Sequence, residues 1–141
     1  MTIQMILAPL FVLVLLTFVI GFGMAGLRTS ALTRREVSPH DIDLGQPNWP
    51  KRSTQVANCF RNQFEVPVLF YVLTILAIMT RHADFLFVVM AWIFVLTRLV
   101  HAYVHVTSNN LRMRGLWFGV GALVLFIMWV VFIVRILLGL P

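Results

Sequence analysis

The sequence predicts an all-α integral membrane protein, built as a bundle of four helices that each cross the bilayer. Of its 141 residues, 60% are hydrophobic and only 11% are charged, and the mean hydropathy is +0.93. A water-soluble domain does not have this balance. The apolar residues also fall into four runs, each of which supplies the roughly 20 residues that a helix needs to cross a membrane.

The four runs define the elements in chain order. We expect helices over residues 3–27, 53–80, 85–106 and 116–140 and a polar connection over residues 28–52, in a single transmembrane domain spanning residues 1–141. In the connection, Ser38 and Pro39 predict the N-cap and the first residue of a short helix. Pro67 lies inside the second run and lacks a backbone N–H, so we expect a kink just beyond Glu65.

Basic residues predict how the bundle is oriented. The connection over residues 28–52 holds five of them and the third connection holds Arg112 and Arg114, whereas the second connection holds only Arg81. The positive-inside rule therefore places the first and third connections in the cytoplasm and both termini outside it. The net charge of +6 does not indicate nucleic acid, because the basic residues end apolar runs and form no patch with aromatic residues.

A cluster of polar residues opens the second run. In a helix, Asn58, Arg61, Asn62 and Glu65 fall at i, i+3, i+4 and i+7 and share one face. A cation, a carboxylate and two amides are costly in a membrane unless they face the interior of a bundle or a wet cavity. A structural network would account for two such residues, but four on one face favour a binding site.

A second polar cluster closes the third run at the same depth. Arg98, His101 and His105 lie on one helical face, and the opposite directions of the two runs bring both clusters to the cytoplasmic side. Polar residues that line a cavity are the simplest account. His101 and His105 also have the spacing of two metal ligands, with Glu65 as a third. Their helix lacks the glutamate that normally accompanies such a pair, so we assign no metal site.

Two arginines flank the start of the fourth run. Arg112 is typical of a positive-inside anchor, whereas Arg114, next to the hydrophobic boundary, is placed to reach a buried anion. An arginine near a thiol favours the thiolate, which is the nucleophilic form. Cys59 is the only cysteine and lies one position off the polar face, so we expect it to pack against lipid or a neighbouring helix.

Taken together, these residues resemble the MAPEG family, the membrane-associated proteins in eicosanoid and glutathione metabolism. Four spans, a long first connection, Arg98-x-x-His101 and the connection that carries Arg114 match in order over nearly the whole chain. The most specific part of the match is Asn62-x-x-Glu65, shortly before Pro67.

The resemblance implies a homotrimer that binds glutathione as a co-substrate between neighbouring subunits, near the cytoplasmic side. A lipophilic small-molecule substrate would arrive from the surrounding membrane lipids. Asn62 and Glu65 would hold the backbone and the amino end of the tripeptide, Arg98 and Arg28 its carboxylates, and Arg114 would act catalytically by stabilising the thiolate.

The chain departs from the family's pattern at four positions. His105 stands where some members have a tyrosine that contacts glutathione. Asn58 occupies the place of an arginine four residues before the motif asparagine, Asn110 that of a second arginine in the third connection, and Phe118 that of an aromatic hydroxyl.

Two hypotheses of function follow. The first is a membrane-embedded glutathione-dependent transferase or peroxidase acting on lipophilic electrophiles, with Asn58, Arg61, His101 and His105 completing the binding site. The second is a non-catalytic membrane subunit or lipid-binding protein that keeps the fold and uses the polar cavity structurally. As a divergent bacterial member, the chain would lie in the inner membrane with both termini outside the cytoplasm.

Overall fold

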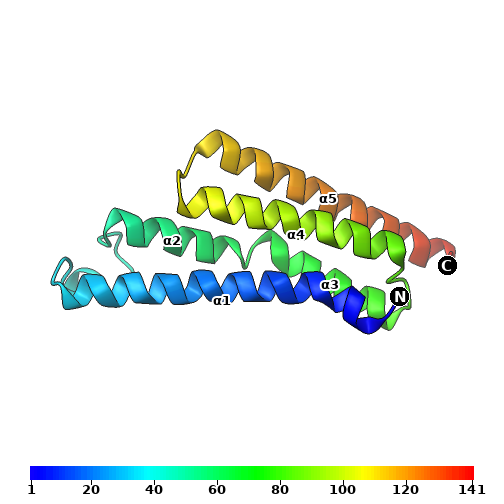
Figure 1. Cartoon of the computed structure of the whole chain (residues 1–141), viewed down its shortest axis with the longest axis horizontal. Helices are drawn as coiled ribbons and strands as arrows, with labels where there is room; N and C mark the ends of the chain where they lie inside the picture. The colour runs from blue at the N-terminus through cyan, green and yellow to red at the C-terminus, as the bar shows by residue number, and fades with distance from the viewer.

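The computed structural model describes residues 1–141 and consists of helices and short connections, without strands (Figure 1). The elements are α1 (Ile3–Thr33), the 3₁₀ helix η1 (Pro39–Asp41), α2 (Lys51–Asn62), α3 (Val66–Met79), α4 (Phe85–Val106) and α5 (Leu111–Leu138). Four stretches are long and apolar enough to cross a membrane: α1, α2 together with α3, α4, and α5. The predicted all-α membrane bundle of four helices is confirmed. α1 and α5 extend past the apolar runs, to Thr33 and back to Leu111, because a helix need not end where the hydrocarbon ends.

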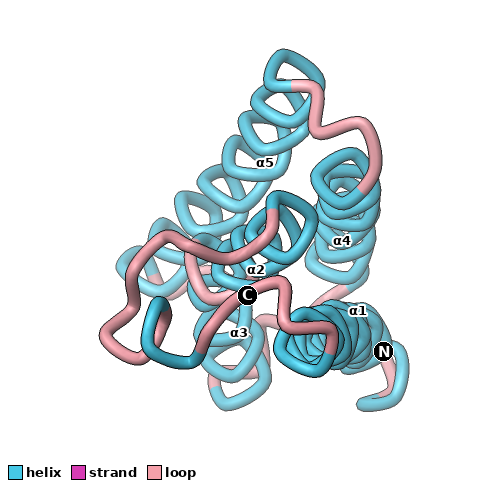
Figure 2. The backbone as a smooth tube through the Cα atoms, turned by 90° about the vertical axis from the view of Figure 1, so that its left-hand side faces the viewer, coloured by secondary structure: helices cyan, strands magenta, loops and turns pink.

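The spans lie roughly side by side along the length of the molecule, and Figure 2 shows them from one end. The connections from α1 to α2 and from α4 to α5 lie at one end of the bundle, whereas both termini and the connection from α3 to α4 lie at the other (Figure 1). α4 packs against α1, α2 and α5, and α3 packs against α1 and α5. This arrangement brings the start of α2 next to the end of α4.

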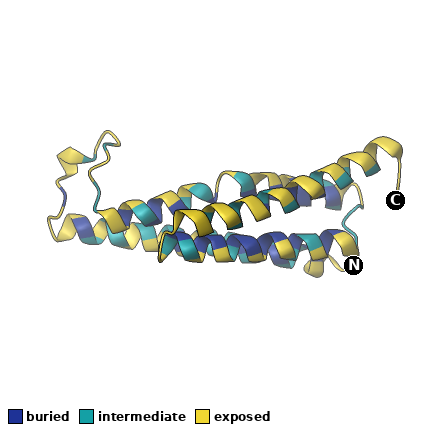
Figure 3. Cartoon of the chain, turned by 90° about the horizontal axis from the view of Figure 1, so that it is seen from above, coloured by how far each residue is buried: buried dark blue, intermediate teal, exposed yellow.

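α4 is the innermost helix of the bundle. In the apolar 18-residue stretch of α4, 50% of the residues are buried, against 17% in that of α5. Figure 3 shows buried residues concentrated along α4. Its Phe94 ring lies 4.9 Å from that of Phe70 on α3, measured between centroids, and both side chains are fully buried with Leu13 of α1. The outward faces of α1 and α5 are apolar and exposed in the single chain, as expected for surfaces that meet lipid or another subunit.

The second span is broken rather than kinked, which corrects the sequence-based expectation. α2 ends at Asn62, and α3 begins only at Val66. Between them the N–H groups of Gln63 and Phe64 donate three residues back, to Phe60 and Arg61, each at 3.0 Å. Such bonds tighten the last turn of α2 into 3₁₀ geometry. Glu65 has left the helix and stands at the N-cap of α3, so the four polar residues do not lie on one continuous helix.

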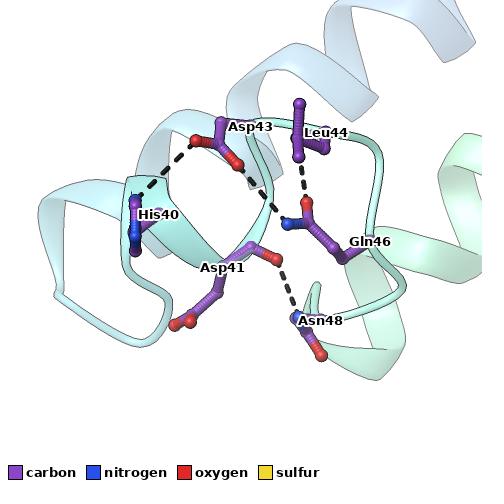
Figure 4. A network of polar contacts seen from close by, with 6 residues as sticks. All are labelled: His40, Asp41, Asp43, Leu44, Gln46 and Asn48. Atoms are coloured by element: carbon purple, nitrogen blue, oxygen red, sulfur yellow. Dashed lines mark hydrogen bonds and ion pairs between the residues drawn. The ribbon is translucent and has the colours of Figure 1, made fainter.

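The first connection carries its own network of polar contacts (Figure 4). As Ser38 and Pro39 predict, a short helix begins at Pro39, although the Ser38 side chain makes no capping hydrogen bond. Beyond it, the Gln46 side chain accepts from the backbone N–H of Leu44 at 2.9 Å, and the Asn48 amide donates to the carbonyl of Asp41 at 2.7 Å. These bonds fold the segment onto itself before α2 begins.

α5 meets α4 closely at Gly121. A methyl group at this position would lie 2.6 Å from Thr97 Oγ1, whose hydroxyl donates to the carbonyl of Phe94 at 2.6 Å. Thr97 therefore cannot turn away without losing that bond. Small residues of this kind allow membrane helices to approach each other.

We expect Gly121→Ala to lower the free energy of unfolding by about 1–3 kcal/mol, because it overpacks the contact between α4 and α5. Gly119→Ala is the matched control, since nothing lies within 4 Å of a methyl group there and alanine is the better helix former. Unfolding of the purified protein in a titration with denaturing detergent measures both. Equal stability of the two variants would contradict the close contact.

At the other end of the bundle, Asp84 joins three elements. It lies between α3 and α4, accepts from the N–H of Phe87 at 2.9 Å and forms an ion pair with Arg135 of α5 at 2.7 Å. Partial burial acts to raise the pKa of Asp84, but the hydrogen bonds from Phe87 and Arg135 and the charge of Arg135 outweigh it and hold the pKa below its ordinary 3.8.

Stability contributed by a carboxylate with a lowered pKa is complete above its unfolded pKa and is lost as the pH falls through the folded value. Relative to Asp84→Asn, the wild-type protein should therefore lose thermal stability below about pH 3.8. Asp84→Ala should cost about 1 kcal/mol at neutral pH through loss of the cap, which asparagine preserves. Melting temperatures of the three proteins across pH test both effects, and identical pH profiles for wild type and Asp84→Asn would exclude the ion pair.

Candidate functional site

A polar cavity of about 440 Å³ lies where the start of the second span meets the end of α4 and the start of α5. It opens at the end of the bundle that carries the two more basic connections. Its walls come from α2, the break after α2, α4 and α5. The lining residues are Asn58, Arg61, Asn62, Glu65, His101, His105, Leu111, Arg114, Gly115 and Phe118. Seven of the nine residues expected at the site from sequence are in this wall. Arg28 and Arg98 are not.

The break after α2 sets the geometry of the motif pair Asn62 and Glu65. Asn62 is the last residue of α2, and Glu65 precedes α3. The Asn62 amide donates to Glu65 Oε2 at 2.8 Å, so the two side chains stay together across the break. The carboxylate keeps its second oxygen for other donors, and Glu65 is exposed to the cavity.

Arg98 lies beneath this pair. It is only 1% exposed, and its guanidinium donates to Asn62 Oδ1 while lying 5.9 Å from the centroid of the Phe118 ring. The chain Arg98–Asn62–Glu65 thus links a buried cation to a carboxylate through one amide. In this chain Arg98 has no free surface for a ligand carboxylate, and it acts on the cavity by orienting Asn62.

His101 and His105 of α4 line the cavity together with Asn62. They are one helical turn apart on α4, with ring centroids 5.5 Å apart and planes at 78°, and His101 also lies 5.9 Å from the Phe118 ring. The Nδ1 atoms of both rings are buried without a hydrogen-bond partner. The chain contains no group of three histidine, cysteine, aspartate or glutamate side chains that could hold a metal ion. His101, His105 and Glu65 therefore do not form such a group within one chain.

The connection from α4 to α5 positions Arg114. Asn109 has a left-handed backbone, with φ of 52°, which asparagine tolerates better than most residues. Its side chain accepts from Arg114 NH1 at 2.6 Å. The next residue, Asn110, is the N-cap of α5 and accepts from the N–H groups of Arg112 and Met113. Arg112 is exposed and does not line the cavity.

Two residues that the sequence analysis did not single out hold the connection in place. Gln55 donates to the carbonyls of His105 at 2.8 Å and Thr107 at 3.2 Å, and Arg52 donates to that of Val106. The last carbonyls of a helix have no partner within it, so α2 supplies the donors that α4 lacks. The i, i+3 spacing of Arg52 and Gln55 was the signal available in the sequence.

Arg28 lies away from the cavity, on another face of the bundle. Its guanidinium carbon is 4.7 Å from the centroid of the Trp49 ring, and it lines a separate pocket with Phe60, Arg61 and Phe64. Cys59 is buried and packs with Ile20 of α1 and Ala102 of α4, so of the two expected environments, lipid or a neighbouring helix, it has the second. Neither residue lines the polar cavity.

A comparison with known families identifies the fold. The sequence profile of the MAPEG family matches residues 6–134. The chain belongs to the MAPEG family. No curated protein and no solved structure matches the chain significantly. Membership indicates a membrane function related to glutathione or eicosanoid metabolism, and the polar cavity of this MAPEG chain contains its Asn62 and Glu65.

We expect Asn62→Ala to destabilise the fold by about 2 kcal/mol, because the buried Arg98 guanidinium loses its side-chain acceptor and hydrogen bonds to charged groups are worth about 1.5–3 kcal/mol. Asn58→Ala is the matched control. Asn58 is exposed on the same helix and should change stability by less than about 0.5 kcal/mol. Unfolding in denaturing detergent compares the two, and equal losses would mean that Asn62 does not hold Arg98.

Proposed function

We propose that this MAPEG chain is a membrane-embedded glutathione-dependent transferase or peroxidase that acts on lipophilic electrophiles. The single observation that carries the proposal is the polar cavity, because it combines a carboxylate, two arginines and two asparagines inside a membrane bundle. Polar groups at this depth are costly and mark functional sites.

The charges of the cavity fit glutathione. The tripeptide carries two carboxylates and one ammonium group. In the cavity, Arg61 and Arg114 could pair with the carboxylates and Glu65 with the ammonium group. Asn58 and Asn62 supply amide donors and acceptors for the peptide groups. His101 and His105, with no charged partner, add nitrogen donors or acceptors from α4.

Arg114 would supply the catalytic electrostatics. One of its terminal nitrogens donates a hydrogen bond to Asn109 Oδ1. The guanidinium is therefore held in place while its other N–H groups remain available to an anion. A preorganised cation beside the sulfur favours the thiolate. The thiolate then attacks the electrophile. In a transferase, the sulfur bonds to carbon and the leaving group departs as an anion with the bonding electrons. In a peroxidase, the sulfur bonds to one peroxide oxygen, the O–O bond breaks, and the other oxygen takes up a proton and leaves as an alcohol. A second glutathione thiol then attacks the sulfenic acid, forming the disulfide and releasing water.

The assembly that we propose is a homotrimer in a bacterial inner membrane, with the cavity on the cytoplasmic side. Support for this orientation comes from the basic residues, which gather in the connections at the cavity's end of the bundle. A neighbouring subunit would close the exposed side of the cavity. The lipophilic substrate would reach the interface from the bilayer.

We expect Arg114→Ala to lower kcat for conjugation of glutathione to a chlorodinitroarene by about 100-fold, which is the effect of removing one donor to a developing or resident anion. KM for glutathione should change less, because Arg61 and Glu65 remain. Steady-state kinetics of the purified protein in detergent measure both, and Arg112→Ala should match the wild type, because Arg112 lies outside the cavity.

Calorimetric titration with glutathione provides the independent test. A well-folded oligomer that gives neither heat nor turnover would overturn the proposal. If Arg114→Ala left binding and activity unchanged while Glu65→Ala dissociated the oligomer, the cavity would be structural. The chain would then be a non-catalytic subunit or lipid-binding protein of the same fold.

A further inference from the structure

A groove runs along α1 on the side of the second span that faces away from α4 and α5. Its membrane half is an apolar pocket of about 480 Å³ between α1 and the break after α2. Its other half is a pocket of about 320 Å³ that contains Arg28 and Arg61. Phe60 and Phe64 line both pockets, so the two pockets adjoin, and together we call them the α1–α2 groove.

The basic half of the groove has no negative partner within the chain. The only ion pairs are His40–Asp43 in the first connection and Arg135–Asp84 at the opposite end of the bundle. The Arg28 guanidinium lies over the Trp49 ring, and its buried Nε has no hydrogen-bond partner. Arg61 is exposed. Two cations without counter-ions at the mouth of an apolar groove favour an anionic occupant.

The apolar half is lined by side chains that suit contact with a lipid acyl chain. Phe18 and Phe22 of α1 are 58% and 72% exposed along its wall. Gly21 lies between them, and a methyl group there would come within 2.8 Å of the Phe60 ring, so the glycine lets that ring lie against α1 as the floor. Gln63 is 1% exposed, and its Oε1 is buried without a partner at the inner end.

We propose that the α1–α2 groove binds an anionic phospholipid, with the phosphate between Arg28 and Arg61 and an acyl chain along Phe18 and Phe22. Charge complementarity favours a net negative headgroup over a zwitterionic one, and the apolar half favours a lipid over free phosphate. Basic pockets between membrane helices on the cytoplasmic side bind anionic headgroups, and this groove opens at the end of the bundle with the basic connections. The groove shares Arg61 with the polar cavity. Arg28 and the apolar half lie outside that cavity, and lipid binding does not depend on thiol binding there.

The test compares phosphatidylglycerol with phosphatidylcholine on the purified oligomer in neutral detergent. Native mass spectrometry reports retained lipid, and melting temperature reports stabilisation by a ligand that binds the folded state. We expect phosphatidylglycerol to bind more tightly. Arg28→Gln and Arg61→Gln should each weaken it about fivefold, since a basic residue near an anionic lipid is worth about that factor. Binding of phosphatidylcholine should not change.

Three controls make the test specific to the groove. Arg112→Gln removes an exposed cation at the same end of the bundle but outside the groove, and should leave phosphatidylglycerol binding unchanged. Arg28→Lys keeps the charge and should restore the lipid preference. Phe22→Ala should weaken both lipids alike, because it removes apolar contact and no charge. Retention of the oligomer on gel filtration shows that each variant is folded.

Several outcomes would overturn the proposal. Equal affinity for the two lipids, or no effect of either glutamine variant, would remove the anion site. Binding of inorganic phosphate as tight as that of phosphatidylglycerol would mean that the acyl chain contributes nothing. Disulfide cross-linking of Phe22→Cys to a second copy, unaffected by added lipid, would show that another subunit fills the groove. Loss of glutathione binding alone would leave the proposal standing.

Discussion

The structure depends on how the chain satisfies its backbone hydrogen bonds where the second span is interrupted. Pro67 has no N–H to donate to the Gln63 carbonyl, and the end of α2 also takes the Gln63 N–H away from the Cys59 carbonyl. In a bilayer no water replaces a missing donor. The backbone of Gln63 donates to Phe60 instead of Cys59, and the Gln63 side chain donates to the carbonyl of Cys59 at 3.2 Å. A buried glutamine thus replaces its own backbone donor and lets α2 end inside the bundle.

This interruption gives the two sides of the second span different chemistry. Asn62 and Glu65 face the polar cavity and are joined across the break, whereas Phe60 and Phe64 face the α1–α2 groove. In a continuous helix Asn62 and Glu65 would also be neighbours, at i and i+3. The hydrogen bond from Asn62 keeps them together across the break, so the carboxylate remains at membrane depth next to its hydrogen-bond donor.

The arginines of the chain divide into structural and available cations. Arg98 is buried and bonded to Asn62, and Arg52 completes the end of α4. Arg114 is half-buried at the cavity, held by Asn109, and Arg28 and Arg61 have no acidic partner within the chain. A guanidinium whose donors are used inside the fold orients its neighbours, whereas one with free donors can bind an anion.

The membrane class, the four spans and the family can be predicted from the sequence, because hydropathy and the Asn62-x-x-Glu65 pair depend only on local chemistry. Helical spacing and the alternating direction of the spans also predict that Asn58, Glu65, His101 and Arg114 line one cavity, as they do. The full break after α2, the burial of Arg98 next to Asn62 and the position of Arg28 in a separate pocket become visible only in the folded chain. These features depend on which side chain completes which hydrogen bond and on which helix face packs inward. Residue spacing along one helix predicts neither of them.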